Sequence, residues 1–120
     1  MVTATKAKLD VKPLILVSYP LIGAKEKDVR DQILLDLPKH HDVFFISGSK
    51  DTLCPIDRLN DVREKMQAKS WLLVVVGANH TMELVSKDEE ESQAMREKTG
   101  RLAAQWLAAR DEWPQYSEIH

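Results

Sequence analysis

The sequence predicts an α/β fold, in which three mostly parallel strands alternate with flanking helices. Three short runs are apolar along their whole length and end at proline, glycine or polar residues: 14–19, 43–47 and 71–76. Strands that are apolar on both faces are typical of parallel sheets covered by helices on both sides. Helical patterns follow each run, which gives the order strand, helix, strand, helix, strand, helix with right-handed crossovers.

The first expected strand, residues 14–19, lies between Pro13 and Pro20. A helix is predicted over 28–37, and Pro38 ends it because proline cannot continue a helix. The apolar residues of this helix share one face by spacing: Val29, Ile33, Leu34 and Leu37.

The second expected strand covers residues 43–47, and a loop joins it to a helix over about 55–68. Pro55 suits the first position of that helix, where its missing N–H has no partner to lose. One side of the helix is apolar: Ile56, Leu59, Val62 and Met66.

The third expected strand, residues 71–76, precedes a long helix over about 87–112, which Pro114 ends. Ser86 and Glu89 have the spacing of a capping box at the start of this helix. Its predicted apolar stripe consists of Met95, Leu102, Ala103, Trp106 and Leu107.

The chain of 120 residues suits one domain. We divide it into a loose N-terminal lead-in over residues 1–12, an α/β segment over 13–113 and a frayed tail over 114–120.

The composition excludes several classes of protein. Seventeen basic against nineteen acidic residues give a net charge of −2, so no domain-wide basic field attracts nucleic acid or an anionic membrane. The one cysteine excludes an intrachain disulfide and fits an intracellular location, cytoplasmic or nuclear. No apolar run reaches the length of a membrane helix, and residues 1–10 lack the apolar centre of a secretory signal.

Two residues with acid–base chemistry follow neighbouring strands. Asp51 comes after the second apolar run and His80 after the third. Parallel strands end at the same edge of a sheet, and neighbouring strands lie about 4.8 Å apart. We therefore expect Asp51 to reach one nitrogen of His80 and fix its tautomer, which leaves the other nitrogen as a general base.

The same residues resemble the C-terminal half of an α/β-hydrolase. Residues 45–51 (Phe-Ile-Ser-Gly-Ser-Lys-Asp) resemble the acid loop of that fold, and residues 75–80 (Val-Val-Gly-Ala-Asn-His) resemble the histidine loop. Residues 16–21 (Leu-Val-Ser-Tyr-Pro-Leu) are similar to a dienelactone-hydrolase-like subgroup. This subgroup includes the hydrolase-like subunit of the non-specific-lethal chromatin complex. The resemblance covers residues 13–107.

The resemblance implies hydrolysis of an ester or related acyl substrate by a Ser-His-Asp mechanism, with Asp51 and His80 as two triad members and with no cofactor or metal. The sequence departs from the family because it contains no Gly-x-Ser-x-Gly nucleophile motif. The family's nucleophile strand would precede Met1. Strand 14–19 is then an open sheet edge, a place for a protein partner or for self-association.

Other interpretations of the site and of the function stay open. Cys54 is a candidate substitute nucleophile, but it follows the acid in the chain. Ser18, Ser47 and Ser49 are poor candidates because none sits on a nucleophile elbow. The run 40–42 (His-His-Asp) suits a solvated turn better than a metal site. The main alternative function is a non-catalytic interaction module, and a nucleotide-binding domain is disfavoured because no glycine-rich loop follows any strand.

Overall fold

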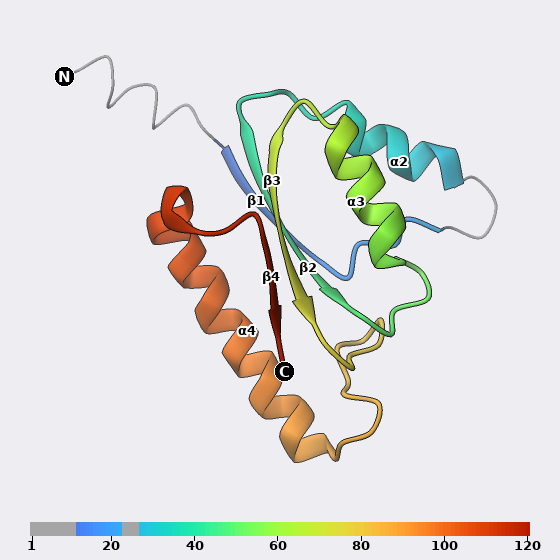
Figure 1. The fold of residues 1–120 in the computed structure, drawn as a ribbon, viewed down its shortest axis with the longest axis vertical. Helices are drawn as coiled ribbons and strands as arrows, with labels where there is room; N and C mark the ends of the chain where they lie inside the picture. The colour runs from blue at the N-terminus through green and yellow to red at the C-terminus, as the bar shows by residue number, and fades with distance from the viewer. Residues whose placement is uncertain (1–11, 23–26) are drawn as a thin grey trace.

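A computed structural model describes residues 12–22 and 27–120, and it contains a four-stranded parallel sheet with helices on both faces (Figure 1). The elements in chain order are β1 (Lys12–Val17), α2 (Lys27–Leu35), β2 (His41–Gly48), α3 (Ile56–Lys65), β3 (Lys69–Val75), α4 (Glu89–Ala109), the 3₁₀ turn η1 (Arg110–Glu112) and β4 (Tyr116–Ile119). The predicted α/β fold class is confirmed, with four strands in place of three. Residues 1–11 of the predicted lead-in lie outside the described residues.

The strands lie side by side in chain order, and every neighbouring pair is parallel. β2 and β3 are central, and their apolar residues are buried on both faces of the sheet, as predicted. β1 is the edge strand that the sequence predicted, but it is only half-buried, and Val17 at its end is 52% exposed. Pro13 suits this edge because proline has no N–H to give to a further strand.

The end of the chain forms a strand, so the prediction of a frayed tail over 114–120 is wrong. The Leu72 N–H donates to Gln115 O at 2.9 Å, and Arg63 donates to the same carbonyl at 2.7 Å. β4 has the sequence Tyr-Ser-Glu-Ile and no apolar run. Backbone pairing with β3 and the bond from Arg63 hold it, and hydrophobic patterning carries no signal for such contacts.

A separate helical layer covers each face of the sheet (Figure 1). Successive residues of β2 and β3 point to opposite faces, which builds two cores. The core under α2 and α3 includes Leu34, Val43, Phe45, Leu59, Val62, Leu72 and Val74. The core under α4 includes Phe44, Ile46, Trp71, Leu73, Val75 and Trp106.

The two helical layers decide the handedness of the crossovers. The chain steps from β2 to β3 and from β3 to β4 in the same direction across the sheet, yet α3 and α4 lie on opposite faces. The two connections therefore have opposite hands, so one of them departs from the right-handed rule for parallel crossovers. The physical reason is the apolar face that Phe44 and Trp71 present, which only α4 covers among the described helices. The sequence predicted crossovers between three strands only, and the connection through α4 to a fourth strand was not among them.

The cap of α4 differs from the prediction. The carboxylate of Asp88 accepts the N–H of Glu91 at 2.8 Å, so Asp88 is the N-cap and the predicted capping box of Ser86 and Glu89 is wrong. Aspartate is a strong cap, and its charge also suits the positive end of the helix.

Two predicted core positions face solvent, Leu107 of α4 and Ile33 of α2. Each is next in sequence to a fully buried residue, Trp106 or Leu34, and adjacent helical residues point about 100° apart. The predicted face of α3 is confirmed, with Leu59, Val62 and Met66 buried and Ile56 packed against them. Among the described helices, none has the length and hydropathy that a membrane span needs.

We expect Trp106→Ala to remove about 3–5 kcal/mol from the free energy of unfolding, because Trp106 is fully buried. Its ring stacks on Phe44 at a centroid distance of 4.9 Å and meets Trp71 edge-on at 5.4 Å. Urea unfolding followed by circular dichroism measures the change. The neighbouring exposed Leu107→Ala should change stability by less than about 0.5 kcal/mol. Equal effects of the two substitutions would contradict this account of the core.

Candidate active site

The loops that follow β2 and β3 touch each other along their backbones. Lys50 N–H donates to Ala78 O at 2.8 Å, and Gly77 N–H donates to the Ser49 hydroxyl oxygen at 2.8 Å. Gly48 makes this approach feasible, because a Cβ at that position would lie only 2.2 Å from Ala78 O. The two loops therefore form one unit at the carboxyl edge of the sheet.

This unit brings together the two residues that the sequence singled out. Nδ1 of His80 and Oδ2 of Asp51 are 3.0 Å apart. The other oxygen of Asp51 accepts the backbone N–H of Leu53 at 2.9 Å, which fixes the orientation of the carboxyl group. The side chain of Asp51 is fully buried, whereas the side chain of His80 is 39% exposed.

The geometry suits proton transfer at one nitrogen of the imidazole. When Nδ1–H of His80 donates to Asp51, the neutral ring keeps its lone pair on Nε2. The exposed part of the ring gives the pair access to solvent, while the acid stays inside the protein. A buried acid that orients a half-exposed imidazole is compatible with general-base chemistry at Nε2.

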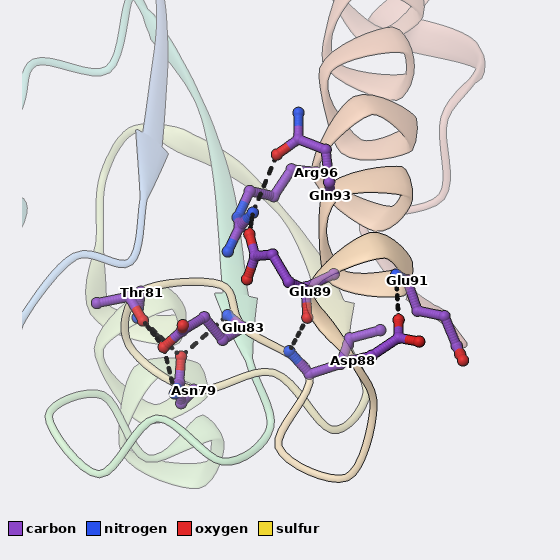
Figure 2. A network of polar contacts seen from close by, with 10 residues as sticks. Asn79, Thr81, Glu83, Asp88, Glu89, Glu91, Gln93 and Arg96 are labelled. Atoms are coloured by element: carbon purple, nitrogen blue, oxygen red, sulfur yellow. Dashed lines mark hydrogen bonds and ion pairs between the residues drawn. The ribbon is translucent and has the colours of Figure 1, made fainter.

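The sequence patterns did not point to the polar turn that surrounds His80. Figure 2 shows Asn79, Thr81 and Glu83 pointing toward one another in the loop after β3. Hydrogen bonds from Thr81 and Asn79 hold the pKa of the Glu83 carboxyl below its usual value. The available signal was the Asn-His-Thr order, because asparagine commonly accepts the backbone N–H two residues later.

The candidate nucleophiles do not join the Asp51–His80 pair. Among the described residues, no hydrogen bond links His80 to a serine or to the cysteine. Cys54 is completely buried in the core under α3, and burial raises the pKa of its thiol. Ser47 is also buried, and the oxygen of Ser49 is engaged by the Gly77 N–H.

Ser18 has the one unusual conformation among these candidates. It follows β1 with a φ of 55°, and its buried hydroxyl has no hydrogen-bond partner within the described residues. Its N–H donates to Ile46 O at 2.8 Å, which ties it to β2. A positive φ is uncommon outside glycine, but the buried oxygen is closed to a substrate.

The residues 40–42 lie at the opposite end of the sheet from Asp51. Asp42 forms an ion pair with Arg110, which follows α4. Within residues 12–22 and 27–120, no group of three His, Cys, Asp or Glu side chains could hold a metal ion.

Comparison with known proteins adds no family to this description. No protein-family model matches the chain, and no solved structure matches it either. The case for a function therefore depends on the geometry of the site and on the residues of the chain.

We expect Gly48→Ala to destabilise the chain by about 2 kcal/mol or more, because the new methyl group collides with the Ala78 carbonyl. Gly100→Ala in α4 is the matched control. A Cβ there meets no atom within 4 Å, so alanine should stabilise the helix by about 0.5–1 kcal/mol. Chemical unfolding of both variants gives the sign of each change in the free energy of unfolding. A Gly48→Ala variant as stable as the wild type would refute the close approach of the loops.

We expect the Cys54 thiol to react with a disulfide reagent roughly 100-fold or more slowly in the native chain than in denaturant. Burial blocks the reagent, and the raised pKa lowers the thiolate fraction at neutral pH. Stopped-flow or manual labelling with a chromogenic disulfide measures both rates. Equal rates would return Cys54 to the list of candidate nucleophiles.

Proposed function

We propose that Asp51 and His80 are the acid and the base of an acyl-hydrolase site that acts on an ester or a related acyl compound. One observation carries the proposal: a fully buried carboxylate lies 3.0 Å from Nδ1 of a half-exposed histidine, on loops that leave neighbouring parallel strands.

Each residue has a defined part in the proposed reaction. Asp51 holds the ring by accepting Nδ1–H and stabilises the imidazolium that forms. His80 Nε2 takes the proton of the attacking hydroxyl group or water and then gives it to the leaving group. The Leu53 N–H supports Asp51 by occupying its second oxygen.

The resemblance to the α/β-hydrolases supports this assignment. In that family an acid follows one strand, a helix crosses over, and a histidine follows the next strand. Asp51, α3 and His80 occur in this order here, and the long helix α4 comes next. The proposal covers acid and base only, because the sequence contains no Gly-x-Ser-x-Gly motif to supply the nucleophile. A nucleophile strand in the position typical of the family would pair with β1, which is an edge strand among the described residues.

The second candidate function is a non-catalytic interaction module. The observation that favours it is β1, an edge strand whose last residue, Val17, is largely exposed. Ser18 N–H and Lys12 N–H face β2, so Ile15 and Val17 direct their backbone groups toward the open side. A strand from a protein partner or from a second copy could pair with these groups.

We expect His80 to act as a general base toward water when the chain hydrolyses p-nitrophenyl acetate, because this route needs no side-chain nucleophile. His80→Ala should lower the protein-dependent rate about tenfold or more, and Asp51→Asn should lower it because the ring loses its orientation. The absorbance of released p-nitrophenolate measures the rate. His120→Ala removes an exposed histidine and is the matched control. Equal rates for the wild type and His80→Ala would refute the hydrolase proposal and favour the interaction module.

A further inference from the structure

The turn that carries His80 is closed by the side chain of the preceding residue. Oδ1 of Asn79 accepts the N–H of Thr81 at 3.0 Å and the N–H of Glu83 at 3.0 Å (Figure 2). The Asn79 N–H in turn donates to Glu83 O at 2.9 Å. Asn79 therefore bonds the backbone of Thr81 and Glu83, and these bonds close the short segment that begins with His80.

The closed turn contains a strained residue. Met82 has a φ of 63° and is buried, and its N–H donates to Asn79 O at 3.0 Å. A methionine in the left-handed region is unfavourable, so it persists only where surrounding contacts determine the backbone. The bonds of Asn79 are those contacts, because they join the residues directly before and after Met82.

The base of the turn is attached to the acid loop. Ala78 O accepts the N–H of Lys50, the residue before Asp51, and Gly77 O accepts the N–H of Val85 at 2.9 Å. Between these anchors, the closure by Asn79 sets where the backbone of His80 lies. The imidazole has no hydrogen bond to a described residue other than Asp51, so the direction of the ring depends on this backbone.

We propose that Asn79 is a positioning residue for His80: its side-chain oxygen holds the turn in the one shape that places Nδ1 beside the buried carboxylate of Asp51. The inference rests on the proposed Asp51–His80 pair and adds the residue that maintains it. Asn79 acts through the backbone and does not touch the imidazole or a substrate.

The carboxylate of Glu83, which lies beside Asn79, determines which variants can test this proposal. Oε1 of Glu83 accepts the Thr81 hydroxyl at 2.8 Å and lies 3.4 Å from Nδ2 of Asn79. Asn79→Asp keeps the accepting oxygen but brings a second negative charge toward Glu83. The double variant Asn79→Asp/Glu83→Gln keeps the accepting oxygen at position 79. The amide introduced at position 83 supplies a donor and removes one of the two negative charges, so this double variant is the rescue. Asn79→Ala removes the oxygen, and Asn79→Gln moves it by one methylene.

Nitrogen-15 NMR of the imidazole gives the tautomer of neutral His80 and needs no catalytic activity. We expect Nδ1–H to predominate in the wild type, because Asp51 accepts this proton. In Asn79→Ala and Asn79→Gln, the ratio of Nδ1–H to Nε2–H should fall about fivefold or more, toward the ratio of the exposed His120 in the same spectrum. The rescue variant should return the ratio to the wild-type value. Backbone amide shifts of β2 and β3 confirm that each variant is folded.

The outcomes separate the two proposals. A folded Asn79→Ala and a folded Asn79→Gln that both keep the wild-type ratio would overturn the positioning role of Asn79 and leave the pair intact. A rescue variant that folds but keeps the low ratio would also overturn it. A wild-type ratio equal to that of His120 would instead overturn the proposed pair.

Discussion

The contact between Gly48 and Ala78 is the constraint on which the candidate site depends. β2 and β3 end side by side, but a side chain on Gly48 would hold the following loops apart. With no Cβ in the way, the Lys50 N–H reaches the Ala78 carbonyl and fixes the spacing of the loops. Asp51 follows directly after Lys50, and His80 lies two residues beyond Ala78. The distance between acid and base is therefore set by backbone contacts.

The two cores explain why this edge of the sheet can hold an ionisable pair. α2 and α3 bury one face of β2 and β3, and α4 buries the other, so the strands that carry the loops are fixed from both sides. Asp51 lies inside this frame, whereas His80 reaches its border. Because its side chain is buried, Asp51 can only orient His80, whereas the exposed part of the His80 ring is accessible to a molecule in solvent. Among the described strands, β1 has one neighbour, β2, so a further chain segment could extend the sheet at this edge.

The sequence revealed the three apolar strands, their helices and the pairing of Asp51 with His80, because strong apolar runs place both residues at one sheet edge. It did not reveal β4, which backbone pairing and Arg63 hold without an apolar pattern. It favoured Ser86 over Asp88 as the cap of α4, since several residues near the helix start can cap and only the backbone geometry selects one. The role of Asn79 depends on the shape of a short loop, which propensities do not determine.

A double-mutant cycle for folding stability tests the central claim, that Asp51 and His80 interact directly. The cycle compares Asp51→Asn, His80→Ala and the double variant by chemical denaturation at neutral pH. The account predicts a favourable coupling free energy of about 1 kcal/mol, modest because His80 is partly exposed. Additive effects, with a coupling free energy near zero, would contradict the claim that the two side chains form a pair.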